Sequence, residues 1–250
     1  MDTDQGSVRN KILRALRPED FEMLRPHMQI MKLNLHQVIE KPHTLIERVI
    51  FFETGLASII GHISGGKSIE VGLIGREGMS GSAVILGSAE PGHRTLIQVA
   101  GYGVSVPASV VAEGMKTSES LRGVLLTYIH TMLAQTASTV VANGLSKLDK
   151  RLARWLLMIH DRIDGTTVAM THEFLAVVLG VRRPGVTVAL HILEGKGLIR
   201  ASRGQITIIN RQGLEQEAGG SYGMAESEYN RLMSKVRSRH SSENSLADKV

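Results

Sequence analysis

The chain has no cysteine among its 250 residues. This absence excludes disulfide bonds, thiolate catalysis, iron–sulfur clusters and every zinc site with a cysteine ligand. It also excludes a redox sensor that works through thiols. A chain of this length can bury enough apolar surface to fold without cross-links.

Long apolar segments are lacking as well. The sequence has no stretch of about 18 uninterrupted apolar residues that would span a membrane. Its first residues, MDTDQGSVRNK, are polar and acidic and do not have the apolar core of a signal peptide. We therefore expect a soluble, cytoplasmic protein with no membrane partner.

Positive charge is concentrated toward the C-terminus. Residues 1–143 carry 13 Lys+Arg and 13 Asp+Glu, whereas residues 144–250 carry 16 and 11, which accounts for the whole net charge of +5. Such an asymmetry indicates a polyanion as partner of the C-terminal part. A modest excess is also common on solvated surfaces, so charge alone does not identify the partner.

The stretch GHISGGKS, residues 61–68, satisfies the phosphate-binding pattern G-x-x-x-x-G-K-[ST]. That chemistry needs a helix beginning at the lysine, because helix N-terminal N–H groups hold the phosphates. Residues 68–73 instead alternate polar or small with apolar residues, which is typical of a strand. The stretch therefore predicts a β-hairpin with Lys67 at its solvated tip.

The N-terminal part contains two different residue patterns in succession. Residues 8–33 have apolar residues at helical spacing, interrupted at Pro18 and Pro26. Residues 36–112 consist of short apolar runs separated by glycine-rich turns. The second pattern predicts a small antiparallel barrel or jelly roll.

Residues 118–143 form a long helical pattern with two apolar stripes. A helix with one packed face needs only one stripe, so the second indicates another partner, such as the same helix of a second chain. The alternative is a helix buried within its own chain. We assign the first of the two stripes to a dimer interface: Leu121, Leu125, Tyr128 and Met132. The second stripe comprises Leu126, Ile129, Leu133 and Val140.

The C-terminal part contains the pattern of a winged helix-turn-helix. A helix over 147–163 precedes a short strand over 167–170, a helix over 172–179 capped by Thr171, and a second helix over 184–194. Gly180 lies in the tight turn between the paired helices, and residues 198–209 read as a hairpin. Arginines at the start of the second helix and at the hairpin tip suit bases and phosphates. The predicted DNA contacts are Thr171, Arg182, Arg183, Thr187, His191 and Arg203.

The run TVAMTHEFLAVVLGVRRPGVTVALHILEGKGLIRASRGQITIINRQGLEQEA resembles the DNA-binding domain of the Crp/Fnr family of bacterial transcription regulators. The resemblance extends over residues 8–223, and the strings IGREGMSG and RRPGVTVALH are similar to those of a rhizobial-type subgroup. It implies an α+β fold in which an antiparallel β-roll acts as sensor. The implied divisions are the roll over 1–117, a dimerisation helix over 118–145, the winged helix-turn-helix over 146–223, and a short helix with a flexible tail over 224–250.

The resemblance also implies an effector pocket, in which this chain departs from the family pattern. The family uses Gly-Glu to bind a ribose hydroxyl and Arg-Ser to bind a cyclic phosphate. The counterparts here are Gly81-Ser82 and Arg94-Thr95, and Thr136 corresponds to the residue that reaches the purine. Because Ser82 replaces the carboxylate, we expect cyclic AMP to bind weakly or not at all, and the effector is unknown.

The recognition helix departs from the family pattern too. The family often has Ser-Arg-Glu-Thr-Val-x-Arg, whereas this chain has Arg-Arg-Pro-Gly-Val-Thr-Val over residues 182–188. Pro184 fits the first helical position and predicts Arg183 as the cap residue. The preferred operator should therefore differ from the best-known site of the family.

We interpret the chain as a homodimeric transcription regulator on a pseudo-palindromic operator, with RNA polymerase as a further partner and no metal, cofactor or catalytic residue. One alternative is a metal-dependent β-barrel enzyme with an appended DNA-binding domain, although the histidines show no metal-ligand spacing. Another is a DNA-binding protein whose roll is only structural.

Overall fold

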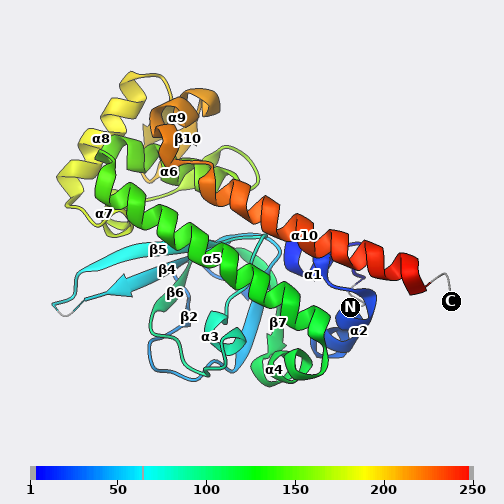
Figure 1. Cartoon of the computed structure of the whole chain (residues 1–250). Helices are drawn as coiled ribbons and strands as arrows, with labels where there is room; N and C mark the ends of the chain where they lie inside the picture. The colour runs from blue at the N-terminus through cyan, green and yellow to red at the C-terminus, as the bar shows by residue number, and fades with distance from the viewer. Residues whose placement is uncertain (1–3, 64, 248–250) are drawn as a thin grey trace.

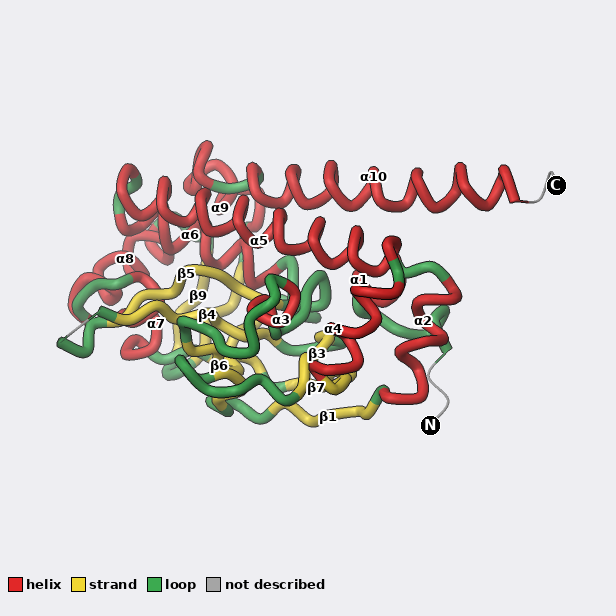
Figure 2. The backbone as a smooth tube through the Cα atoms, turned by 60° about the horizontal axis from the view of Figure 1, so that its bottom comes forward, coloured by secondary structure: helices red, strands yellow, loops and turns green. Residues whose placement is uncertain are grey.

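The computed structural model describes residues 4–63 and 65–247. Along the chain it contains an N-terminal β-roll, a long helix that lies along it, a C-terminal helical domain with a small sheet, and a final long helix (Figure 1). Figure 2 shows the two long helices side by side over the strands of the roll.

Short helices precede the roll. Helix α1 (Lys11–Ala15) begins at Asn10, whose side-chain oxygen accepts hydrogen bonds from the N–H groups of Ile12 and Leu13. Helix α2 (Pro18–Leu24) and a 3-10 turn, η1 (Arg25–His27), each have a proline in the first turn. The predicted helical stretch over 8–33 was too long, because residues 29–33 are strand β1, paired with β7.

The roll consists of two antiparallel sheets, in the orders β1-β7-β3 and β2-β6-β4-β5. Apolar side chains from both sheets, such as Phe52 and Ile97, form one core between them. Helix α3 (Ser82–Ile85) lies between β5 and β6 of the roll, and helix α4 (Ala108–Thr117) follows β7. The strands are β1 (Gln29–Leu33), β2 (Val38–Glu40), β3 (Arg48–Phe52), β4 (Leu56–His62), β5 (Ser68–Ile74), β6 (Arg94–Val99) and β7 (Gly101–Pro107). The predicted antiparallel roll is thus confirmed.

The hairpin prediction for GHISGGKS is also confirmed. Strands β4 and β5 pair in antiparallel register from Ala57↔Ile74 to His62↔Ser68. Lys67 is followed by a strand, and Gly66 at the tip has a φ of +79°, a conformation that favours glycine. No helix N-terminus is available at this position to hold phosphates.

Helix α5 (Glu119–Leu145) begins at Ser118, whose Oγ accepts a hydrogen bond from the N–H of Leu121 at 3.1 Å. The stripe that we assigned to the dimer interface is wrong. Leu121, Leu125 and Tyr128 are fully buried against the roll of their own chain, and Met132 packs beside them. The Tyr128 hydroxyl donates to the carbonyl of Met79.

The other face of α5 is exposed instead. Leu133 and Val140 are each 64% exposed, and Leu126 is 45% exposed. Ile129, which we placed on the same stripe, is buried. The sequence showed that two apolar faces exist, but the roll covers the face opposite to the one expected.

The C-terminal domain contains helix α6 (Leu148–His160), the pair α7 (His172–Leu179) and α8 (Arg183–Gly195), and α9 (Arg211–Ala218). Its sheet has the order β8-β10-β9, with β8 (Thr167–Ala169), β9 (Ile199–Ser202) and β10 (Gln205–Ile208). Strands β9 and β10 form the predicted hairpin. Only Ser146 and Lys147, both extended, separate α5 from α6.

The chain continues through η2 (Gly219–Ser221) into helix α10 (Met224–Ala247), which packs along α5 (Figures 1 and 2). The helix expected in 224–250 is longer than predicted, since α10 extends to Ala247, and the flexible tail stays a prediction. Ala225, Tyr229, Met233 and Val236 recur every three to four residues and pack inward, so this polar segment has an apolar stripe.

Candidate nucleic-acid interface and effector pocket

Helices α7 and α8 form a tight pair whose axes are bent by 100°. As predicted, the Thr171 hydroxyl caps α7 by accepting a hydrogen bond from the N–H of Phe174 at 3.1 Å. Gly180 ends α7 with a φ of +62°, and a side chain there would also collide with Ile69 of the roll. The crossing lies in the range of helix-turn-helix units.

Helix α8 buries one side and exposes the other. Val186, Ala189, Leu190 and Leu193 are buried in the domain core, as the spacing predicted. Arg182, Arg183 and His191 are exposed, whereas Thr187 is half-buried. The prediction of Arg183 as cap is wrong by one residue, because the carbonyl of Arg182 already accepts the first turn's hydrogen bond from Gly185 N.

The two arginines differ in their surroundings. Arg183 Nε lies 3.1 Å from Glu173 Oε1 in an exposed ion pair that connects α8 to α7. Arg182, the N-cap residue, has no such ion pair within residues 4–63 and 65–247. Thr187 Oγ1 lies 3.2 Å from His172 Nδ1 and so faces α7. Arg182 is therefore the less constrained cation at the start of the helix.

The wing is held to α8 by a specific contact. Glu194 Oε1 accepts a hydrogen bond from the N–H of Ala201 at 2.9 Å. Arg203 is exposed at the tip, next to Gly204 with a φ of +73°. A surface hollow of about 810 Å³ lies between α7, α8 and the wing, and four predicted contacts line it: Thr171, Arg183, His191 and Arg203.

Two apolar residues on the exposed side of α8 were missed. Val188 retains 59% of its exposure and Ile192 retains 39%. Apolar side chains at such positions can contact the methyl group of thymine in a major groove. The sequence contained a sign of this contact, since Val188 occupies the place where the family often has arginine. We considered only the missing arginine and not the apolar contact that valine can make.

The candidate effector pocket of the roll contains a carboxylate from the chain itself. Glu40, at the end of β2, is buried and lies opposite Thr95 in the strand register. Its Oε1 accepts a hydrogen bond from the N–H of Gly81 at 2.6 Å, and its Oε2 accepts one from the hydroxyl of Thr95. His93 Nε2 is 3.7 Å from Oε2.

These partners decide the charge of Glu40. Burial alone would raise its pKa, but the nearby His93 and the hydrogen bonds from the Thr95 hydroxyl and the Gly81 N–H outweigh burial and hold the pKa below its ordinary value. The carboxylate is therefore ionised at neutral pH and occupies two of the donors expected to face an anionic effector. A second anion at these donors would meet a like charge.

For the remaining predicted pocket residues, Arg94, Ser82 and Thr136, no hydrogen bond or ion pair with Glu40 is found among the described residues. Arg94 begins β6, and its Nε is buried without a hydrogen-bond partner among the described residues. Ser82 is the first residue of α3, after Gly81 with its φ of +86°. Thr136 is half-buried on α5, where the neighbouring Gln135 accepts from Leu73 N at 2.6 Å. The structure thus brings Gly81 and Thr95 together around Glu40.

The roll and the C-terminal domain are packed against each other. Leu56 and Leu73 of the roll belong to the same buried cluster as the core of α6, α7 and α8. Trp155 Nε1 of α6 donates to Glu70 Oε1 of β5 at 2.8 Å. Both side chains are buried, so a polar contact lies inside this interface.

Two further properties, metal binding and membrane insertion, can be compared with the structure. Within residues 4–63 and 65–247, no group of three or more His, Asp or Glu side chains is arranged to hold a metal ion. Helix α5 is long and apolar enough by composition to cross a membrane, but it packs along the roll and α10. Its buried face is therefore part of the protein core.

Comparisons with known proteins agree with this geometry. Residues 150–217 match the family of the Crp-like helix-turn-helix domain. Among curated protein sequences, none matches this chain significantly. The fold is similar to that of a Crp/Fnr-family transcriptional regulator from Eubacterium rectale, with 19% identity, a TM-score of 0.66, and coverage of 84% of this chain and 98% of that chain.

Two further solved structures have a similar fold. FixK2 from Bradyrhizobium japonicum is 17% identical, with a TM-score of 0.65 over 77% of this chain and 98% of that chain. The c-di-GMP-responsive global regulator CLP of Xanthomonas campestris is 15% identical, with a TM-score of 0.60 over 77% of this chain and 99% of that chain. The chain therefore has the fold of the Crp/Fnr regulators, and residues 150–217 form a Crp-like helix-turn-helix domain.

Proposed function

We propose that this protein is a sequence-specific DNA-binding transcription regulator of the Crp/Fnr type. The observation that carries the proposal is the exposed face of α8, with Arg183 and His191 on one side of a hollow and Arg203 of the wing on the other. Arginine can make a paired contact with guanine in the major groove, and a wing arginine suits a backbone phosphate. The match of residues 150–217 to a Crp-like helix-turn-helix domain supports the same function.

The regulator acts as a homodimer through the exposed face of α5. Leu126, Leu133 and Val140 are spaced by seven residues, which is the repeat of a coiled-coil seam, and all three are exposed in the single chain. Two copies related by a two-fold axis would place their α8 helices on half-sites about one helical turn apart. The operator is therefore pseudo-palindromic.

The effector is not cyclic AMP. The support for this is Glu40, whose carboxylate already uses the Gly81 N–H and the Thr95 hydroxyl, together with Ser82 in place of the ribose-binding glutamate. Displacing an ionised, hydrogen-bonded carboxylate by another anion is unfavourable. Any small molecule that regulates this protein through the roll should therefore be recognised differently.

The finer assignments follow from the same proposal. The strings IGREGMSG and RRPGVTVALH support a rhizobial-type subgroup. A regulator of this type acts in the cytoplasm, and RNA polymerase is its further partner. No observation favours the alternative of a metal-dependent enzyme over this function.

Selection of bound DNA from a random pool, with and without cell metabolites, tests the proposal. We expect enrichment of a motif with two inverted half-sites. A double variant, Arg182→Ala with Arg183→Ala, should enrich none, whereas Arg14→Ala, an exposed arginine on α1, serves as a control that changes charge far from α8. Absence of any enriched sequence with the unmodified protein would show that this function is wrong.

A further inference from the structure

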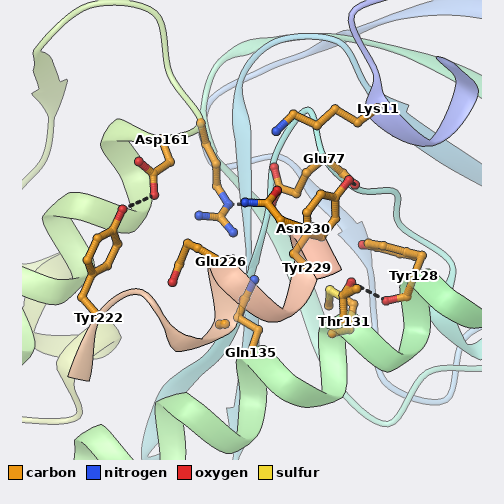
Figure 3. Close-up of a pocket in the computed structure, with 13 residues that line it drawn as sticks. Lys11, Glu77, Tyr128, Thr131, Gln135, Asp161, Tyr222, Glu226, Tyr229 and Asn230 are labelled. Carbon is orange, nitrogen blue, oxygen red and sulfur yellow. Dashed lines mark hydrogen bonds and ion pairs between the residues drawn. The ribbon is translucent and has the colours of Figure 1, made fainter. Parts of the chain in front are cut away.

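A cavity of about 330 Å³ lies where five parts of the protein meet. Its lining comes from α1, the roll, α5, the end of α6 and the beginning of α10, and Figure 3 shows these side chains around the central space. The volume is within the range of pockets that bind small molecules. This cavity is separate from the pocket around Glu40, and the resemblance to known regulators assigns nothing to it.

Most polar groups of the cavity already have partners within the protein. Arg162 Nε and Glu77 Oε1 form a buried ion pair at 2.6 Å. Asp161 Oδ1 pairs with Arg211 at 2.8 Å, and its Oδ2 accepts a hydrogen bond from the Tyr222 hydroxyl at 2.7 Å. These bonds fix the walls, so the cavity is preformed and its charges largely cancel.

Two charged groups retain bonding capacity. Glu226 Oε2 accepts from Gly223 N at 3.1 Å, but Glu226 Oε1 is buried and has no hydrogen-bond partner among the described residues. Lys11 Nζ lies 5.6 Å from the centre of the Tyr229 ring and takes part in no ion pair within residues 4–63 and 65–247. A buried acceptor without a donor is costly unless a bound group satisfies it.

The cavity wall also has an apolar part, in addition to Glu226 and Lys11. Tyr128 and Met132 come from α5. The ring of Tyr229, which Figure 3 labels along with Tyr128, comes from α10. A complementary molecule therefore carries a hydrogen-bond donor for Glu226, an anionic group for Lys11, and a small apolar part. An α-amino acid has this combination within the available volume.

We propose that this junction cavity binds a small zwitterionic metabolite of amino-acid size, with its ammonium group at Glu226 and its carboxylate at Lys11. The ligand contacts α1 of the N-terminal part, α5, and α10, next to Asp161 and Arg162 at the end of α6. Binding would therefore stabilise one arrangement of the roll relative to the C-terminal domain. An effect of this binding on operator affinity rests on the proposed function. Operator affinity is therefore measured separately from ligand binding.

Binding is tested on the free full-length protein by calorimetry and thermal unfolding, with each proteinogenic amino acid at up to about 10 mM. We expect at least one to bind, and its deaminated and decarboxylated analogues to bind at least about tenfold more weakly, because each lacks one charge-assisted hydrogen bond. Glu226→Gln and Lys11→Met should weaken binding by a similar factor. The control variants Glu90→Gln and Lys41→Met change exposed residues on the roll and should leave binding unchanged.

Three results would overturn the proposal: no amino acid binds, the analogues bind as well as the parent molecule, or binding is unaffected by both cavity substitutions. Far-UV circular dichroism of each variant confirms that a loss of binding is not a loss of folding. Because these measurements contain no DNA, they fail or succeed independently of the regulator function. Operator affinity with and without the bound amino acid then tests the regulatory role alone.

Discussion

Trp155 Nε1 of α6 donates a hydrogen bond to Glu70 Oε1 of β5 at 2.8 Å, and this bond crosses the interface between the C-terminal domain and the roll. The other oxygen of Glu70 lies 2.6 Å from Ser58 Oγ, which also contacts Gln98 Oε1. The Ser58 hydroxyl has one proton and two oxygen neighbours. A protonated Glu70 supplies the second proton that this arrangement needs.

Stability should therefore depend on pH through Glu70. Burial raises its pKa from 4.5 to about 7, although the hydrogen bonds with Ser58 and Trp155 favour the ionised form. Because the folded state holds the proton more tightly than the unfolded state, the contribution is full below about pH 4.5 and declines as pH rises through about 7. The loss is on the order of 3 kcal/mol.

Glu70→Gln should remove most of this dependence, since glutamine is neutral and keeps an acceptor for Trp155 and a donor for Ser58. Urea unfolding of both proteins between about pH 5 and pH 8 measures the effect. If the two proteins lose stability in parallel over this range, Glu70 is not the group responsible.

The two arginines at the start of α8 should have different roles. Arg183→Ala should cost about 1–3 kcal/mol per half-site and relax the preference at one symmetric base pair. Arg182→Ala should weaken binding to all sequences alike and reduce the salt slope by about one unit. Because Glu173 holds Arg183 in the free protein, Arg183 must exchange that ion pair for the base.

Binding to randomised half-sites at several salt concentrations separates these roles. If Arg182→Ala alters base preference and Arg183→Ala alters only the salt slope, Arg182 is the residue that contacts the base. The Arg182 side chain makes no capping hydrogen bond, so it can also reach a base. If neither substitution alters base preference, α8 does not read DNA through this pair. Glu173→Gln provides a further measurement, and it should strengthen binding modestly by releasing Arg183.

Dimerisation should depend on the exposed stripe of α5. Leu133→Glu places a charge at the centre of the seam and should shift the protein to monomer in sedimentation experiments, with a parallel loss of operator affinity. Leu45→Glu is the matched control, because Leu45 is 61% exposed in the loop between β2 and β3 of the roll. A Leu133→Glu protein that remains dimeric would place the interface elsewhere.

Cyclic AMP should raise operator affinity by no more than a few-fold. An effector must bind the DNA-competent state better than the other, and Glu40 opposes an anion at Gly81 and Thr95. An enhancement of about a hundredfold would contradict this assignment. Glu40→Gln should also destabilise the roll by about 1.5–3 kcal/mol, because it removes hydrogen bonds to a charged acceptor.

The sequence predicted those features that depend on neighbouring residues. The cap at Thr171, the stop at Gly180 and the buried side of α8 each arise from local chemistry, and each is found in the structure. The hairpin at residues 61–68 could be distinguished from a phosphate loop for the same reason. Four of the six candidate DNA contacts also line one surface hollow: Thr171, Arg183, His191 and Arg203.

Features that depend on distant residues were not predicted. The sequence of α5 shows two apolar stripes, but only the packed roll determines that Leu121 faces inward and Leu133 outward. Glu40 is brought opposite Thr95 by the pairing of β2 with β6, and it bonds the N–H of Gly81, so both partners are more than forty residues away in sequence. The full length of helix α10 was not predicted, because polar residues dominate its composition and conceal the stripe around Met233.

The connection between α5 and α6 limits how the C-terminal domain can move. Only Ser146 and Lys147 lie between two helices, and each residue contributes two soft backbone torsions. A change of state in the roll can therefore reach α8 as a pivot about this joint, whereas a sliding motion would require α5 or α6 to unwind. Lys147→Pro, at a φ of −63° that proline allows and after the extended Ser146, would stiffen the pivot without touching any ligand or base, and a change in the roll would then move α8 less.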